Sequence, residues 1–172
     1  MAKNIVDAEQ LELVSTPAAT STHTPIAHSL LADRTRDALG RAGFEITQEE
    51  HALARGGLRY FGGFALKGES IEGSDRKLVL GLRNAHDKSF AASVCIGNQM
   101  LVCDNLCFSS DVKLSRRHTV NILRDLNTVL SSAVSRVVSH WTDMGKRIDA
   151  YKGSELSKER ASDLVVDLAE MG

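Results

Sequence analysis

The sequence predicts an α+β fold, and three observations lead to that prediction. Apolar runs between residues 77 and 110 are broken by sharp turns, which is typical of antiparallel strands. Apolar residues between 26 and 42 recur at helical spacing, and a second series of this kind extends from Leu130 to Tyr151. We therefore expect an N-terminal helix, a curved antiparallel sheet of about five strands, a long helix packed across it and a C-terminal helix.

Size and composition narrow the class of protein. The chain has 172 residues, enough for one domain with a core of respectable size, and its formal net charge is −1. This balance gives neither the strongly basic field of many nucleic-acid-binding proteins nor the acidic surface of a DNA mimic. No apolar stretch is long enough to span a bilayer. The 3 cysteines have no disulfide-rich spacing, which favours a reducing cytoplasm.

The chain divides into three predicted segments. Residues 1–27 are rich in Ala, Ser and Thr and hold both prolines, so we expect a flexible tail. Residues 28–151 form the predicted core domain, and residues 152–172 a C-terminal helix that is a candidate oligomerisation element. The first helix of the core should begin near Pro25 or Ala27 and end at Ala42, with Gly43 just beyond its end.

Two strands should follow this helix. Phe44 and Ile46 begin the first, which becomes polar through residues 48–50. After a loop at Gly56-Gly57, residues 58–65 alternate between the two faces of a second strand that its glycines bend or flatten.

The central apolar runs predict a three-stranded meander. Residues 78–82 form the first run, and the turn at 86–89 interrupts it because Asp and Ser side chains bond to local amides. Residues 90–96 form the second run, and Gly97-Asn98 then suits a type II′ hairpin before the third run at 100–103. The runs are apolar on both faces, so we expect a sheet at least partly covered on each side. Residues 105–110 are a candidate for another short strand.

The long helix should begin in the basic segment around residues 113–119, with Ser115 or Thr119 as its cap. Its apolar seam has heptad spacing and consists of Leu130, Val134, Val137, Trp141, Met144, Ile148 and Tyr151. Packing across the sheet is the favoured interpretation of this seam, and self-association is the alternative. A last helix over 155–171 adds a second apolar face, so we predict a homo-oligomer, with a dimer as the default, that uses the segment from Trp141 to Met171.

Three short motifs carry a family resemblance. They read RNAHDKSF, VCDNLCFS and RRHT, and the matching positions are Arg83, Asn84, His86, Asp87, Val102, Cys103, Asp104, Asn105, Arg117, His118 and Thr119. The chain resembles a phage- and plasmid-associated family catalogued as domain of unknown function 932. The resemblance implies the context of a mobile genetic element, and the family brings no enzymatic role. The order of elements is also similar to that of phage single-strand annealing proteins.

The motif residues suggest two kinds of reactive site, a metal site and a nucleophile with its base. Cys103, Cys107, His118 and His86 are ligand types that zinc accepts, although their spacing matches no standard zinc finger or ribbon. Cys103 and His118 could alternatively act as nucleophile and base, but no third group or oxyanion hole accompanies them. The simpler interpretation is structural, with Thr119 at a helix cap and Asn105 at a turn. We predict no cofactor, and the absence of nucleotide-binding and hydrolase motifs disfavours an ordinary enzyme.

The basic residues suggest a different kind of site. The predicted patch for nucleic acid consists of Arg83, Lys113, Arg116, Arg117 and Arg124, and a solvated surface is its ordinary interpretation. Tyr60, Phe61 and Phe64 could stack on bases, although core packing is expected for at least two of them.

Our leading hypothesis from the sequence is a phage or plasmid accessory protein that binds single-stranded nucleic acid, for example for annealing. A protein-binding inhibitor of a host defence system, comparable to anti-CRISPR proteins, is the first alternative. A metal-dependent enzyme is the second.

Overall fold

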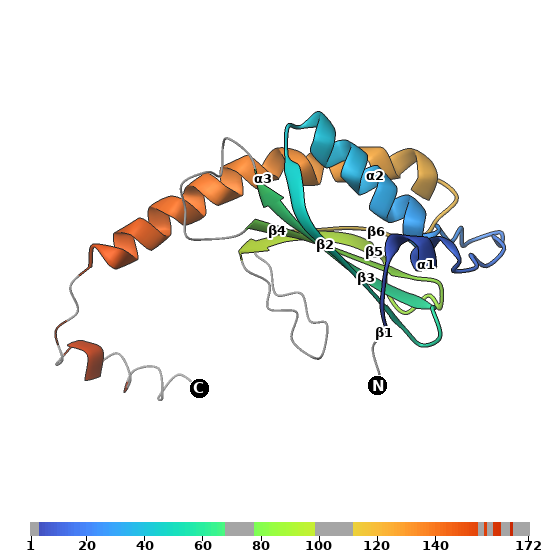
Figure 1. Ribbon diagram of the computed structural model, residues 1–172, viewed down its shortest axis with the longest axis horizontal. Helices are drawn as coiled ribbons and strands as arrows, with labels where there is room; N and C mark the ends of the chain where they lie inside the picture. The colour runs from blue at the N-terminus through green and yellow to red at the C-terminus, as the bar shows by residue number, and fades with distance from the viewer. Residues whose placement is uncertain are drawn as a thin grey trace. The chain divides into compact units, whose positions relative to one another are not determined.

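Six antiparallel strands form one sheet in the computed structural model of the chain (Figure 1). The strands follow one another in sequence order and are β1 (Asn4–Val6), β2 (Glu45–Ala54), β3 (Arg59–Lys67), β4 (Leu78–Ala85), β5 (Ala92–Asn98) and β6 (Val112–Arg116). The helices are α1 (Ala8–Glu12), α2 (His28–Arg41) and α3 (Ile122–Lys152). The predicted α+β class is confirmed, with six strands among the residues that the structure describes in place of about five.

The structure describes residues 4–67, 78–98 and 112–154, together with 157, 160–162 and 166. Residues 1–138 form one structural unit and residues 139–172 a second. Figure 1 shows α2 and the first part of α3 on the same side of the sheet.

The predicted flexible tail is ordered instead, and this prediction was wrong for residues 4–27. β1 pairs with β2, and Asp7 and Gln10 cap α1 by exchanging hydrogen bonds with each other's backbone N–H. The side chains of Leu11 and Ile26 are each 1% exposed. Ile5 and Leu13 of the same segment stay 83% and 84% exposed. Leu11 and Ile26 therefore anchor the segment to the core, and its backbone bonds to distant parts of the chain.

Helix α2 agrees with its prediction. Leu31 and Leu39 are fully buried on one side of it, and the chain leaves the helix through Gly43, whose φ of +80° suits the position after a helix end. The helix therefore covers the sheet with the apolar stripe that the sequence indicates.

Strands β3 and β4 have two chemically different faces. Tyr60 pairs in register with Asn84, and Phe61 pairs with Arg83, so each pair lies on one face of the sheet. The face that carries Tyr60 and Asn84 looks toward α2, because the rings of Tyr60 and His28 stack at 5.3 Å between centroids. We call this the helix face, and its side chains at Tyr60, Phe64, Leu80, Leu82 and Asn84 are completely buried.

The other surface of the sheet, which we call the opposite face, is mixed. Phe61 and Arg83 are partly exposed there, whereas Ser93 is only 4% exposed. The prediction of a sheet at least partly covered on both sides is confirmed.

The hairpin predicted at Gly97-Asn98 does not form. Both residues belong to β5, where Gly97 pairs with Val79 and Asn98 with Leu78. Continuing the ladder satisfies more backbone groups than turning at this point would. The predicted runs at 100–103 and 105–110 lie outside the described residues.

The basic segment does not open the long helix. Lys113, Ser115 and Arg116 are in β6, which pairs with β5, and α3 begins only at Ile122. The Ser115 hydroxyl is 2.9 Å from that of Ser93, so it bonds across the sheet instead of capping a helix. Pairing with β5 decides the conformation of this segment, and the local sequence contains no information about that pairing.

The first half of the predicted seam on α3 is buried. Leu130, Val134 and Val137 are at most 5% exposed, and these residues lie in the first structural unit. This agrees with packing of the seam inside the protein.

The second unit contains the end of α3, which closes at Gly153, whose N–H donates to Asp149 O at 2.9 Å. The helix thus ends just after Tyr151, the last residue of the predicted seam. Most of the predicted last helix lies outside the described residues, and the homo-oligomer stays a prediction. No helix among the described residues is both long and apolar enough to cross a membrane.

Candidate functional site: a cationic pocket beside a buried histidine network

A buried hydrogen-bond network is centred on Asn84, which is completely buried on the helix face. Its amide oxygen accepts from His118 Nε2 at 2.6 Å. Its amide nitrogen donates to the backbone oxygen of Ile26 and to His28 Nδ1, each at 2.9 Å. His28 Nε2 then donates to the backbone oxygen of Gly57 at 2.9 Å. Every polar atom of the Asn84 side chain is therefore used to connect β4 with three other segments.

The network fixes the charge and tautomer of two histidines. Burial lowers the pKa of His28 to about 4, and burial together with the nearby His23 lowers the pKa of His118 to about 4. Both imidazoles are neutral at pH 7. Because His118 donates through Nε2, its Nδ1 carries the lone pair, and His28 uses its own Nδ1 as the acceptor.

His86 completes the group from the turn after β4. Its ring stacks on that of His28, with centroids 3.9 Å apart and an angle of 8° between the planes. Its Nε2 donates to Ile26 O at 2.8 Å, so this one carbonyl accepts from both Asn84 and His86. The Nδ1 of His86 is buried without a hydrogen-bond partner.

A second polar chain crosses the helix face near α2. Arg36 donates to both carboxylate oxygens of Glu49, and His51 Nε2 lies 2.8 Å from Glu49 Oε1. His51 Nδ1 accepts from the Tyr60 hydroxyl at 2.9 Å. Burial raises the pKa of Tyr60 well above its ordinary value, so its hydroxyl stays protonated and donates. Tyr60 and Phe64 are thus core residues, as expected for at least two of the three candidate rings.

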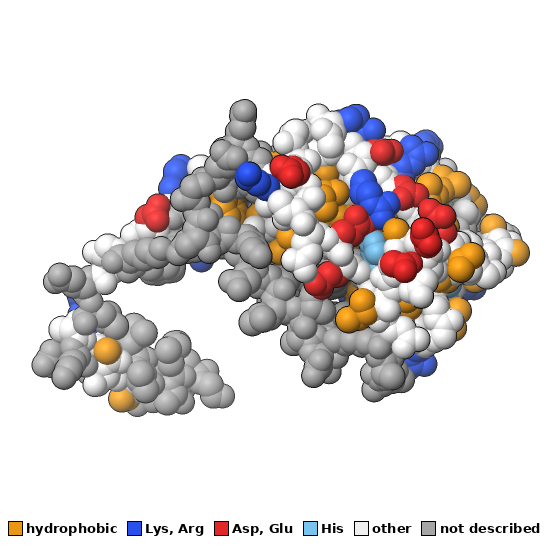
Figure 2. Space-filling model, in the orientation of Figure 1, with side chains coloured by type: hydrophobic (Ala, Val, Ile, Leu, Met, Phe, Trp, Pro, Cys, Tyr) orange, Lys and Arg blue, Asp and Glu red, His pale blue; other side chains and the backbone are white. Residues whose placement is uncertain are grey.

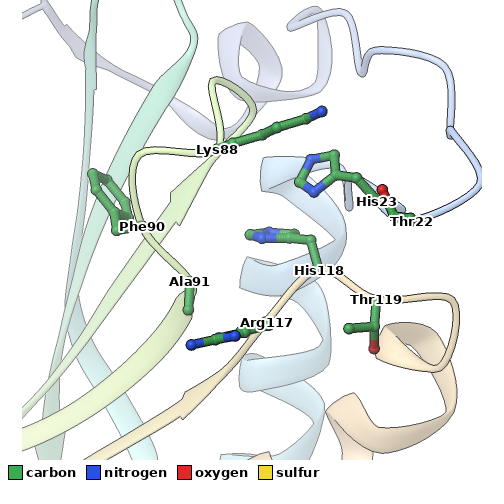
Figure 3. Close-up of a pocket in the computed structure, with 8 residues that line it drawn as sticks. All are labelled: Thr22, His23, Lys88, Phe90, Ala91, Arg117, His118 and Thr119. Atoms are coloured by element: carbon green, nitrogen blue, oxygen red, sulfur yellow. The ribbon is translucent and has the colours of Figure 1, made fainter.

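An open pocket of about 480 Å³ lies next to His118 (Figure 3). We call it the cationic pocket, and it is lined by Thr22, His23, Lys88, Phe90, Ala91, Arg117, His118 and Thr119. In Figure 3, Lys88 and Arg117 lie on opposite sides of the His118 ring, one from the turn after β4 and one from the end of β6. None of these eight residues is acidic.

His23, which lines the pocket, has a ring nitrogen without a hydrogen-bond partner. Its Nε2 is buried and has no hydrogen-bond partner, and its ring centroid lies 5.3 Å from that of His118. Burial lowers the pKa of His23, and the positive charge of Lys88 lowers it further. An anion in the pocket would reverse the second effect.

The cations of the protein differ in whether they face a carboxylate. Arg116 and Arg124 both bond to Asp125, and these hydrogen bonds and charges hold the pKa of that carboxyl below its usual range. Among the described residues, Lys88 and Arg117 form no ion pair. Figure 2 shows acidic and basic side chains intermingled over the face that carries α2 and β2. The cationic pocket is therefore a better anion site than the Arg116–Arg124 part of the predicted patch.

Arg83 belongs to a cluster of rings and guanidinium groups that we call the opposite-face cluster: Arg59, Phe61, Arg83 and Phe90. The guanidinium carbon of Arg83 lies 5.0 Å from the centroid of the Phe90 ring, and that of Arg59 lies 5.8 Å from it. The centroids of the Phe61 and Phe90 rings are 5.7 Å apart. Phe90 belongs to both the cluster and the cationic pocket, so the two form one continuous surface.

Two further motif residues, Asp87 and Thr119, lie in the turn after β4 and at the cationic pocket. Asp87 bonds to Arg59 at 2.8 Å and accepts from the N–H of Ser89 at 3.1 Å, which confirms the side-chain bond predicted for this turn. Thr119 lines the cationic pocket. The structure thus brings Asn84, His86 and His118 together.

Several predicted site residues lie outside the described residues: Cys103, Asp104, Asn105 and Cys107. The side chain of Lys113 is likewise not described. Within the described part of the chain there is no group of three or more His, Cys, Asp or Glu side chains that could hold a metal ion. The metal and nucleophile hypotheses stay predictions.

Sequence reasoning missed three pocket residues, Lys88, Phe90 and His23. Lys88 and Phe90 stand inside the first motif, two and four residues after His86, but only the polar turn was interpreted there. His23 lies in the segment that the sequence predicts to be a flexible tail. For Lys88 the sequence signal is its place in the predicted turn at 86–89, and the structure puts it at the bend of that turn with a φ of +63°.

Comparisons with known proteins give one match. A family described as "Domain of unknown function (DUF932)" matches residues 18–171. Neither the curated proteins nor the solved structures include one with significant similarity to the chain. The match covers the cationic pocket, the buried network and the opposite-face cluster, and it agrees with the resemblance seen in the three motifs. The chain therefore belongs to the DUF932 family of domains of unknown function.

Proposed function

We propose that the protein binds single-stranded nucleic acid across the cationic pocket and the opposite-face cluster. The observation that carries the proposal is the pair formed by Lys88 and Arg117, which are exposed, line one pocket and face no carboxylate among the described residues. Phosphate is the anion that nucleic acids present at regular intervals, and Lys and Arg are its usual partners.

The aromatic side of the surface favours single strands over duplexes. Phe90 and Phe61 are partly exposed, and guanidinium planes lie beside Phe90. Rings of this kind stack on bases only when the bases are unpaired and can turn outward. Guanidinium groups add cation–π and phosphate contacts to the same surface.

The mobile-element context that the motif resemblance implies is compatible with this function, because single strands arise during the replication and recombination of such elements. The chain has the expected order of an N-terminal helix, an antiparallel meander and a long helix. We therefore propose an accessory role on single strands, with annealing as one form of it.

Fluorescence anisotropy with a labelled single-stranded oligonucleotide tests this proposal at a series of salt concentrations. We expect binding that weakens as salt rises, because each neutralised phosphate releases counterions. The double variant Lys88→Ala/Arg117→Ala should lower the slope of log K against log salt by roughly 1.4, which is two contacts at about 0.7 each. Phe90→Leu should weaken binding by about 1–3 kcal/mol with little change in this slope.

The matched control is Arg34→Ala/Arg41→Ala, which removes two exposed positive charges from α2. It changes the net charge by the same amount and should leave the slope unchanged. Equal losses in the two double variants would show that only net charge matters and would reject the site. No binding at micromolar protein in low salt would reject the function and favour a protein partner.

A further inference from the structure

The cationic pocket has more positive charge than one internal phosphate needs. An internal phosphodiester carries one negative charge, whereas a terminal phosphate carries close to two at neutral pH. The pocket offers the ammonium of Lys88 and the guanidinium of Arg117, with no acidic lining residue to neutralise them. These two positive charges, which approach from opposite sides of His118, match the charge of a dianion.

Neutral donors in the pocket suit a third phosphate oxygen. His23 has a buried Nε2 without a partner, and Thr22 and Thr119 line the same space. A buried nitrogen without a partner is costly unless something bonds to it. A bound phosphate oxygen next to His23 would satisfy it, and would favour its protonated form over the neutral one.

The surroundings of the pocket also suit the end of a nucleic-acid strand. Its wall at His118 is only 5% exposed, and that imidazole is tied to Asn84 behind it. The volume of about 480 Å³ is in the range that holds a single small ligand. On its other side, Phe90 leads onto the opposite-face cluster. A strand can therefore lie along the cluster and finish in the pocket.

We propose that the cationic pocket binds the terminal phosphate of a nucleic-acid strand, with Lys88, Arg117 and His23 on the phosphate and Phe90 against the last base. This inference rests on the proposed function and adds recognition of a strand end to it. The chemistry is that of a phosphate monoester, and it is shared by 5′ and 3′ ends.

Three oligonucleotides of one sequence, each with an internal label, test the inference. One carries a 5′-phosphate, one a 3′-phosphate, and one hydroxyls at both ends. We expect one phosphorylated strand to bind roughly tenfold more tightly than the hydroxyl strand, since a charge-assisted contact at a partly desolvated site gives a gain of this size. Arg117→Ala and His23→Gln should each reduce that ratio, and Arg34→Ala/Arg41→Ala should leave it unchanged.

The outcomes separate the inference from the function on which it rests. Equal binding of the three strands, with Arg117→Ala weakening all of them alike, would overturn end recognition and keep single-strand binding. If no strand binds, calorimetry with deoxyadenosine 5′- and 3′-monophosphates tests whether the pocket binds a phosphate monoester. Binding of either that is lost in Arg117→Ala would support the phosphate site and reject the strand-binding function, and no binding would overturn both.

Discussion

Asn84 and Arg83 are neighbours in β4, yet they serve opposite faces of the sheet in opposite ways. Asn84 is completely buried on the helix face, and each of its polar atoms has a partner. Arg83 is partly exposed on the opposite face, where its guanidinium lies beside Phe90 and no carboxylate among the described residues pairs with it. The polar groups of Asn84 hold segments together, whereas Arg83 makes one hydrogen bond, from its Nε to Ser93 Oγ at 3.3 Å, and remains partly exposed. The motif residues Asn84, His86 and His118 are on the first face.

The largest expected effect is the response of the helix face to acid. His28 and His118 titrate at about 4 when folded and near 6.5 when unfolded, so the unfolded chain binds more protons between these values. The free energy of unfolding should therefore fall as pH drops through this window, by roughly 2–3 kcal/mol per pH unit near pH 5 for the two groups together. Urea titrations between pH 7.5 and 5 measure this.

The chosen range keeps most carboxylates ionised, so they contribute little to the slope. The pKa of His51 is also lowered by burial and adds in the same direction. Constant stability from pH 7.5 to 5 would show that these histidines are not buried in neutral form, and the contrast between the faces would lose its basis.

The second effect compares the two neighbours directly. Asn84→Ala removes the partner of His118 Nε2 and of His28 Nδ1, and we expect a loss of about 3 kcal/mol in the free energy of unfolding. Arg83→Ala should cost less than about 1 kcal/mol, because its side chain is partly exposed. Denaturation midpoints of the two variants give the comparison. Similar losses would mean that Arg83 is as structural as Asn84.

The smallest effect separates two adjacent glycines of β3. A Cβ at Gly62 would lie 2.2 Å from the Tyr60 hydroxyl on the helix face, whereas a Cβ at Gly63 meets no atom within 4 Å. Tyr60 is fully buried and bonded to His51, so it has little room to move. Gly62→Ala should cost about 1–3 kcal/mol, and Gly63→Ala should be neutral to within about 0.5 kcal/mol. Thermal unfolding of both variants checks the order, and a larger loss for Gly63→Ala would contradict it.

Local patterns were enough where local forces decide the structure. Alternation over residues 58–65 predicted the two faces of β3, and Asp87 marked the turn that it does form with Ser89. Gly97 and Asn98 were misjudged because Val79 and Leu78 supply ladder partners that a local turn preference cannot anticipate. The prediction for residues 4–27 was wrong because composition shows only how little apolar surface a segment can bury. It does not show that β2, Asn84 and His118 bond to the backbone of this segment.

The candidate site was harder to predict than the fold. The sequence indicates the charges of the patch, but only the fold brings Asp125 of α3 to Arg116 of β6, while the same carboxylate also bonds to its neighbour Arg124. The Asn84, His86 and His118 motif residues were recognised as a set, yet their common contact with residues 23–28 depends on tertiary structure. Lys88 and Arg117 are far apart in sequence, and only the fold brings them to the same pocket.

The docking of residues 24–28 has a consequence for the order of events during synthesis. This segment leaves the ribosome early, but Asn84 and His86 follow Ile26 by 58 and 60 positions, and Thr24 N–H waits for the His118 carbonyl. Closing such long loops costs chain entropy before any bond rewards it. The bonds of this segment to Asn84, His86 and His118 therefore cannot form until most of the sheet has been translated. It should reach its native place only after β6 has emerged, although it is made before five of the six strands among the described residues.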